Sequence, residues 1–230
     1  SDVLSLPIDP IFEQYSNNTF DKKENVFTLL YVGRFFYQKN IHGIIEICYK
    51  LKCIMNFKLL LVGNWYYYED GEKYKAFINN LIEKYELTDY IEFKGYLKGE
   101  DLKRVYNEAD LFINLTLNTD ENFGLVQAEA LSQGLPIVCS DWGGLKDHVK
   151  HGWNGFKINT RYENNSIIID LEEALRYVLL LTDNKEREKM AKNSRQKFLA
   201  SYSSNFLIFK LEAYMEEAIK KNNEPISIIA

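Results

Sequence analysis

Short apolar runs that alternate with segments of helical spacing constrain the fold of this chain more than any other feature. The runs are rich in β-branched residues and lie at 26–32, 57–62, 90–94, 111–115, 136–140 and 155–158. Between them, apolar residues recur every three or four positions over 41–52, 70–86, a short segment after Gly99, and 123–133. Strands that are apolar on both faces are typical of parallel sheets covered by helices on both sides. The alternation therefore predicts a doubly wound α/β domain.

Shifts in composition divide the chain into three parts. Residues 1–25 contain Pro7, Pro10 and a polar stretch, which predict a linker. Residues 26–160 carry the alternating pattern and form the predicted core. The chain is polar over 159–166, after which helical spacing continues to near the end, so we expect 161–230 to be a helical tail that completes the domain.

Charge and cysteine content exclude several classes of protein. The 33 acidic and 28 basic residues leave a net charge of −5, the wrong sign for a protein whose main ligand is nucleic acid. Three cysteines and three histidines without paired spacing supply neither a disulfide framework nor a zinc site. No apolar run reaches the roughly 18 residues of a membrane-spanning helix. We expect a cytoplasmic protein.

Polar residues directly after the strands are the first candidates for a site, because open parallel sheets bind ligands at the carboxyl ends of their strands. The run at 26–32 is followed by Gly33, Arg34 and then Lys39, just before a predicted helix. Two cations at the positive end of a helix favour a bound anion between them. A diphosphate fits, with Arg34 binding it bidentately and Lys39 as a point charge. A solvated Arg and Lys in a surface loop is the alternative.

Two acidic residues follow the run at 111–115. Glu121 precedes a predicted helix, and Glu129 lies inside it on an otherwise apolar stretch, where an unpaired carboxylate is costly. Between them, Asn122 and Gly124 tolerate unusual backbone angles and let the chain pass close to a ligand. The alternatives are an acid placed by the helix dipole for Glu121 and a structural ion pair for Glu129.

The same two acids do not suit a glycosidase pair. Such carboxyl groups lie about 5–9 Å apart across the sugar. Eight residues that include a helix start place the backbones at about or beyond that limit, at roughly 1.5 Å per helical residue. Two binding acids, one at each end of a long ligand, agree better with this spacing.

Several motifs together resemble the donor-binding half of retaining GT-B enzymes in glycosyltransferase family 4. Gly33-Arg34 with Lys39, the E-x7-E element of Glu121 and Glu129, and its Phe123-Gly124 centre occur in the family's order. The resemblance covers about residues 26–160 and includes further segments at 134–138, 140–149 and 152–156. Residues 6–12 are similar to the segment that leads out of the family's N-terminal domain. The resemblance implies a Rossmann-like domain, one half of a GT-B fold.

The resemblance also implies roles for these residues. Arg34 and Lys39 would neutralise the diphosphate of a nucleotide sugar and the charge that grows on the departing nucleoside diphosphate. Glu121 would accept hydrogen bonds from the transferred sugar, so Arg34, Lys39 and Glu121 are the implied catalytic set. Glu129 would hold the ribose hydroxyls. The other implied donor contacts are Gly33, Asn122, the amides of Phe123, Gly124 and Leu125, and the base-binding segment Gly95, Tyr96 and Leu97.

The chain departs from the family pattern in places. Asn40 and Asn122 stand where glycine is frequent, a mild change because asparagine tolerates left-handed angles. Trp142 beside Gly143 is less usual, and covers the sugar or simply packs. The family's acceptor site lies on a separate N-terminal Rossmann domain, and residues 1–25 are too short to form one.

Three further features have two interpretations each. The aromatic stretch 65–68 stacks on a base or sugar, or, as we favour, covers the sheet edge or an interface. His148 and His151 lack a matched acid and are interpreted as helix-end and loop residues rather than acid–base catalysts. The apolar stripe of the tail suits a membrane surface or a neighbouring domain, and its many acids favour a domain.

The sequence thus predicts the donor half of a retaining glycosyltransferase. It would bind a nucleotide sugar, with UDP or GDP as the expected nucleotide, and transfer a hexosyl group to a sugar, lipid or protein hydroxyl. No cofactor or metal is expected, because Arg34 and Lys39 would replace the cation and the chain has no Asp-x-Asp cluster. The acceptor domain would lie in the full protein or in a partner chain. A nucleotide-sugar-binding regulatory subunit without turnover is the alternative, and a nicotinamide oxidoreductase is disfavoured because Gly33 and Gly63 each stand alone.

Overall fold

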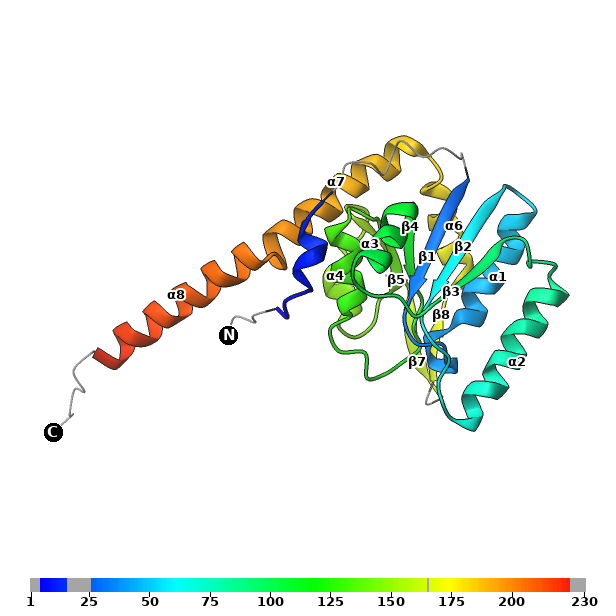
Figure 1. The fold of residues 1–230 in the computed structure, drawn as a ribbon, viewed down its shortest axis with the longest axis horizontal. Coiled ribbons are helices and arrows are strands. Elements are labelled where there is room, and N and C mark those ends of the chain that lie inside the picture. The colour runs from blue at the N-terminus through cyan, green and yellow to red at the C-terminus, as the bar shows by residue number, and fades with distance from the viewer. Residues whose placement is uncertain (1–4, 16–25, 165, 224–230) are drawn as a thin grey trace.

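A computed structural model describes residues 5–15, 26–164 and 166–223 of the chain. A six-stranded sheet forms its centre, with strand order β3-β2-β1-β4-β5-β6 and every neighbouring pair parallel (Figure 1). The strands are β1 (Phe27–Val32), β2 (Phe57–Val62), β3 (Ile91–Gly95), β4 (Leu111–Asn114), β5 (Ile137–Ser140) and β6 (Gly155–Ile158). All six apolar runs are therefore strands, and the predicted α/β class is confirmed.

Helices cover both faces of the sheet and enclose two hydrophobic cores. One core lies beneath α1 (Ile41–Lys52), α2 (Glu69–Lys84) and α6 (Leu171–Leu180). The other lies beneath the short helix η1 (Pro10–Glu13) and α3 (Gly99–Glu108), α4 (Leu125–Ser132), α5 (Leu145–His148) and the end of α7 (Asn184–Ser201). The remaining helical segments are η3 (Tyr37–Lys39) and α8 (Ser204–Asn223). Two cores on opposite faces are the doubly wound arrangement that the alternation predicts.

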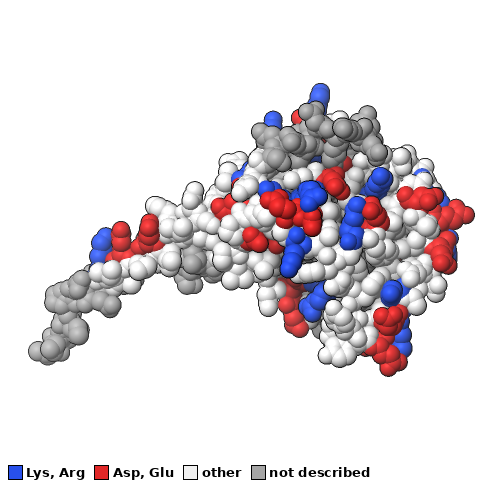
Figure 2. Space-filling model, in the orientation of Figure 1, with Lys and Arg blue, Asp and Glu red and all other residues white. Residues whose placement is uncertain are grey.

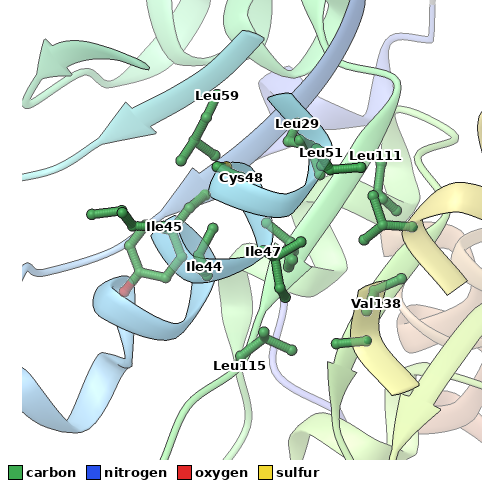
Figure 3. Close-up of a cluster of buried hydrophobic side chains, with 14 of the residues drawn as sticks. Leu29, Ile44, Ile45, Ile47, Cys48, Leu51, Leu59, Leu111, Leu115 and Val138 are labelled. Carbon is green, nitrogen blue, oxygen red and sulfur yellow. The ribbon is translucent and has the colours of Figure 1, made fainter. Parts of the chain in front are cut away.

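Helix α1 shows how the pattern specifies the packing. Its apolar residues recur at helical spacing and are buried, among them Ile44, Ile45, Cys48 and Leu51. They contact side chains of β1, β2, β4 and β5 in the centre of the sheet (Figure 3). Truncating one such Leu or Ile to Ala lowers the free energy of unfolding by about 2–5 kcal/mol. The packing of α1 therefore holds these central strands in place.

A short antiparallel hairpin replaces the start of the predicted helical tail. Strands β7 (Thr160–Glu163) and β8 (Ser166–Ile169) pair with each other, and helix begins only at Leu171. The expectation of helix from 161 is wrong for this segment. Ile167 is buried whereas Ile168 is exposed, the alternation of a half-buried strand that a run of β-branched residues favours.

The C-terminal region beyond the hairpin is helical, as expected. Helix α8 projects away from the sheet, beyond the body of the molecule (Figure 1). In the described part of the chain, no helix is both long and apolar enough to cross a membrane. Lys and Arg side chains are interspersed with Asp and Glu over the body in the view of Figure 2.

Candidate functional site

A cavity of about 580 Å³ opens at the carboxyl ends of β1, β2 and β3. It extends to α3 and to α4, which contribute Leu102, Val126 and Glu129. Five of the predicted site residues line it: Gly33, Arg34, Tyr96, Leu97 and Glu129. The other lining residues are Asp9, Phe12, Val32, Val62, Gly63, Asn64, Trp65, Tyr66, Tyr67, Lys98 and Gly99. The cavity lies where an open parallel sheet binds its ligands.

Glycines at the strand ends let the chain pass close beneath the cavity. Gly33 donates its amide to the carbonyl of Val62 (2.9 Å), and Gly63 donates to that of Gly95 (2.9 Å). A Cβ on Gly63 would lie 1.9 Å from the backbone oxygen of Gly33. Any side chain at Gly63 would therefore push β1 and β2 apart.

Arg34 presents an exposed cation at the cavity. Its backbone carbonyl accepts a hydrogen bond from the Tyr31 hydroxyl (3.1 Å), which fixes the turn after β1. Its guanidinium carbon lies 5.6 Å from the centre of the Phe36 ring. Within the described ranges Arg34 forms no ion pair, so its donors are available to an anionic ligand.

Lys39 and Glu121 meet in an ion pair beside the cavity rather than in its lining. Lys39 Nζ donates to the Glu121 carboxylate, and both side chains are about six-sevenths buried, at 13% and 15% exposure. Lys39 follows β1 and Glu121 follows β4, which are neighbours in the sheet. The cavity and the ion pair thus lie side by side along the ends of β3, β2, β1 and β4, a span of about 14 Å at ~4.8 Å per strand. That length suits an extended ligand.

Asn40 has a structural reason to differ from glycine. It adopts a left-handed backbone (φ 57°) between η3 and α1, and its side-chain oxygen accepts a hydrogen bond from the amide of Gly43 (3.2 Å). Asparagine tolerates this conformation and also caps the helix, which glycine cannot do with a side chain. The residue orients the turn that carries Lys39.

Glu129 is held by a tyrosine that the sequence did not indicate. The hydroxyl of Tyr106, a fully buried residue of α3, lies 2.9 Å from the Glu129 carboxylate and donates to it. Burial raises the pKa of Glu129 to about 7, with a further contribution from the nearby Asp9 carboxylate, while the Tyr106 hydrogen bond opposes the rise. A carboxylate so poorly solvated gains from ligand hydroxyl groups. The predicted alternative, an ion pair to Glu129, does not occur within the described residues.

Two glycines seat the segment that joins Glu121 to α4. A Cβ on Gly144 would lie 1.4 Å from the backbone oxygen of Asn122, and one on Gly143 would lie 2.4 Å from that of Glu121. Gly144 also donates its amide to the Glu121 carbonyl (3.0 Å). Only glycines permit this close approach, so 143–144 set the position of 121–123.

Helix α4 begins at Leu125, two residues later than the sequence predicts. Gly124 caps it with a left-handed backbone (φ 76°) and supplies no side-chain hydrogen bond. The first amides of α4 therefore remain available for an anion, as expected of a helix N-terminus. Asn122 to Leu125 connect the ion pair to this helix, and none of them lines the cavity.

The aromatic stretch and the histidines are mainly structural. Trp65 packs against Phe35 (5.1 Å between ring centres) and Phe93 (5.7 Å), which covers the sheet edge as favoured. Tyr66 and Tyr67 also line the cavity, so the stacking interpretation stays open. His151 accepts a hydrogen bond from the Lys157 amide (3.2 Å), as in the loop interpretation.

Trp142, the less usual residue beside Gly143, stacks on Tyr162 of the hairpin at 6.1 Å between ring centres. Among the described residues, no group of three or more His, Cys, Asp or Glu side chains is arranged to hold a metal ion.

Fold and cavity together define a doubly wound, Rossmann-like α/β domain with its ligand site at the carboxyl ends of the strands. The particular family follows from residues 13–197, which match the family described as "Glycosyl transferases group 1". The chain belongs to this family.

Relatives of known sequence agree with that assignment, and a solved structure shares the fold. An uncharacterized glycosyltransferase of Methanocaldococcus jannaschii is 29% identical over 175 residues, which cover 76% of this chain and 41% of the relative. The lipopolysaccharide 1,2-N-acetylglucosaminetransferase of Salmonella typhimurium is 27% identical over 199 residues (86% and 50%). Anabaena HepE in complex with UDP superposes with a TM-score of 0.77 at 20% identity, covering 94% of this chain and 57% of that one. The chain thus spans about half the length of the relatives it matches.

Proposed function

We propose that this chain is the donor half of a retaining, GT-B-type glycosyltransferase of family 4. The observation that carries the proposal is the cavity at the ends of β1–β3, whose lining includes Arg34, which forms no ion pair with the described residues, and the partly buried Glu129. A cation and a hydrogen-bond acceptor at these places suit the diphosphate and the ribose of a nucleotide sugar.

The order of residues along the sheet edge supports one orientation of this ligand. The base would lie near Tyr96 and Leu97, the ribose at Glu129, the diphosphate at Arg34 and the N-terminus of α4, and the sugar at Glu121. Lys39, which forms an ion pair with Glu121 in this structure, would then also offset the negative charge on the departing nucleoside diphosphate. Gly95 and the backbone of 122–125 would supply main-chain contacts.

Metal independence belongs to the same proposal. Arg34 and Lys39 would offset the charge that a divalent cation offsets in other enzymes. UDP- or GDP-sugars are the expected donors, and the solved structures of HepE with UDP agree with such a donor for that relative.

The division of labour within the full protein is also proposed. Residues 1–25 would link to an acceptor domain, 26–160 would bind the donor, and 161–230 would complete the domain and pack toward the acceptor domain. The acceptor would be a sugar, lipid or protein hydroxyl, and the protein would act in the cytoplasm or at a membrane surface.

A transfer assay separates the enzyme from a regulatory subunit. The chain is mixed with an N-terminal Rossmann domain from the same coding region, a radiolabelled UDP- or GDP-sugar and a panel of hydroxyl acceptors. The proposal expects labelled product with the α-linkage of the donor retained. Binding without product across the panel would favour the regulatory subunit instead.

A further inference from the structure

A buried histidine lies directly behind the start of α4. His148 ends α5, is 1% exposed, and its Nε2 lies within hydrogen-bond distance of the Phe123 carbonyl. Its ring packs against the Phe123 ring at 5.0 Å and against the Tyr202 ring at 4.9 Å between centres. Tyr202 stands at the corner between α7 and α8, so the contact joins the tail to the segment 121–124.

The hydrogen bond fixes the chemical form of the ring. A carbonyl only accepts, so Nε2 carries the proton and donates it to Phe123. Nδ1 is buried and has no partner in the described part of the chain, which agrees with an unprotonated nitrogen. Burial lowers the pKa of His148 to about 4, so the ring is neutral near pH 7.

Geometry carries the effect of this bond to the next residue. The Phe123 carbonyl and the Gly124 amide belong to one peptide unit, which is planar and trans, so the two groups point in opposite directions. When His148 holds the carbonyl toward α5, the Gly124 N–H points away from α5. That N–H has no acceptor among the described residues, and α4 begins immediately after it.

We propose that His148 is a positioning residue of the donor site. Through the Phe123–Gly124 peptide unit it aims the Gly124 N–H at the ligand and fixes the entry of the chain into α4. The proposal rests on the proposed function, because the ligand it serves is the nucleotide sugar. His148 does not itself touch the ligand.

Three variants separate the effect of the His148 hydrogen-bond donor from the effect of its ring packing. His148→Phe keeps a ring against Tyr202 and removes the donor, whereas His148→Gln keeps a donor and removes the ring. Tyr202→Phe keeps the ring that packs on His148 and is the matched control. Titration calorimetry with UDP-glucose and GDP-mannose measures affinity. NMR hydrogen exchange measures protection of the Gln127 amide, which donates to the Gly124 carbonyl at the entry of α4.

The hydrogen-bond donor of His148, rather than its ring, should determine both the affinity for nucleotide sugar and the rate of amide exchange. We expect H148F to weaken binding about tenfold and to accelerate exchange of the Gln127 amide, with exchange in β1 unchanged. We expect H148Q to restore both and Tyr202→Phe to change neither. If H148F does not fold, His148→Met, which also lacks a donor, is measured in its place.

Two results would overturn the positioning role: wild-type exchange of the Gln127 amide in H148F, or failure of H148Q to restore that exchange to the wild-type rate. If the wild-type chain binds neither nucleotide sugar, the proposed function fails, and exchange in the same variants still decides whether His148 positions Gly124.

Discussion

At the scale of single residues, Arg34 offers the most direct test of the diphosphate site. Its guanidinium is exposed at the cavity and forms no ion pair with the described residues, so removing it leaves no buried partner behind. We expect Arg34→Ala to weaken nucleoside diphosphate binding by about 1.5–3 kcal/mol, roughly 10- to 150-fold. Titration calorimetry measures the change.

The matched control for this substitution lies on the hairpin. Arg161 is exposed on β7, pairs with Glu163 and lies outside the cavity lining. Arg161→Ala should leave nucleotide affinity within about twofold of wild type. Equal losses in the two variants, or no loss in Arg34→Ala, would contradict the assigned diphosphate site.

Glu129 predicts a pH dependence of stability. Burial raises its pKa from 4.5 to about 7, so the folded state binds more protons than the unfolded state between these values. The free energy of unfolding should therefore fall as pH rises from about 4.5 to 7, by about 3 kcal/mol from this group. Urea unfolding of the wild type and of Glu129→Gln at pH 5, 6, 7 and 8 measures this slope as the difference between the two proteins. The comparison is needed because His148, whose pKa is lowered to about 4, contributes a slope of the opposite sign below about pH 6.5 in both.

Replacing Glu129 should raise the free energy of unfolding and weaken the binding of nucleotide sugar. Glu129→Gln removes the buried charge, so we expect it to be about 2–3 kcal/mol more stable than wild type at pH 8 and to bind nucleotide sugar at least tenfold more weakly. Glu216→Gln, at an exposed position of α8, should change neither. A variant as stable as wild type at pH 8 would show that Glu129 is not a strained, buried carboxylate.

The sequence indicates which residues face the cavity better than it indicates what holds them. Arg34 was predicted because it follows a strand, and Glu129 because it lies within an otherwise apolar helix. Both places can be read from the order of residues along the chain. The Tyr106 hydrogen bond and the approach of Asp9 depend on how α3 and η1 pack against α4, which periodicity does not specify. A tyrosine on the buried face of α3 was the only available signal.

At the scale of elements, the close approach of 143–144 to 121–123 can be tested separately from backbone conformation. Gly144 has an ordinary backbone (φ −72°), so an added Cβ acts only through its collision with the Asn122 oxygen. We expect Gly144→Ala to reduce the free energy of unfolding by about 1–3 kcal/mol and to weaken nucleotide binding, because the segment 121–124 must move. Chemical unfolding and calorimetry measure the two effects.

Gly152 provides the opposite case. Its backbone is left-handed (φ 73°), and a Cβ there would meet nothing within 4 Å. Gly152→Ala should cost about 1 kcal/mol of stability through conformation alone and leave binding unchanged. Weaker binding in Gly152→Ala, or full binding in Gly144→Ala, would contradict the positioning role of 143–144.

Element types were predictable wherever one pattern dominated. The six core strands combine apolar runs with terminal glycines or polar residues, and no helical spacing competes with them. The hairpin of β7 and β8 was missed because its first strand is polar and exposed, and its second is too short to show a period. Pairing between the two strands, a non-local contact, decides the structure there.

At the scale of the whole molecule, α8 is the part least tied to the fold. Phe209, Leu211, Met215 and Ile219 are about half to two-thirds exposed, and α8 projects from the body (Figure 1). Deleting residues 209–230 should lower the melting temperature by less than about 4 °C, corresponding to under ~1 kcal/mol. Deleting 184–230 removes the buried Met190 and Phe198 of α7 and should abolish cooperative unfolding. Similar losses from both deletions would place α8 within the core.

The half-length match and the exposed face of α8 belong together in the proposed architecture. The chain covers 41% and 50% of two relatives, and the apolar side chains of α8 have acidic neighbours such as Glu212 and Glu216. We propose that this face packs on the acceptor domain. The donor site then needs only this chain for binding, and both halves for transfer.

Binding of a nucleotide sugar by this chain is measured by titration calorimetry with UDP-, GDP- and ADP-glucose, each with and without EDTA. We predict that at least one nucleotide sugar binds with one-to-one stoichiometry, with the same affinity in EDTA, and at least tenfold more weakly to Arg34→Ala. Absence of binding by all three, or binding that disappears with the chelator, would contradict it.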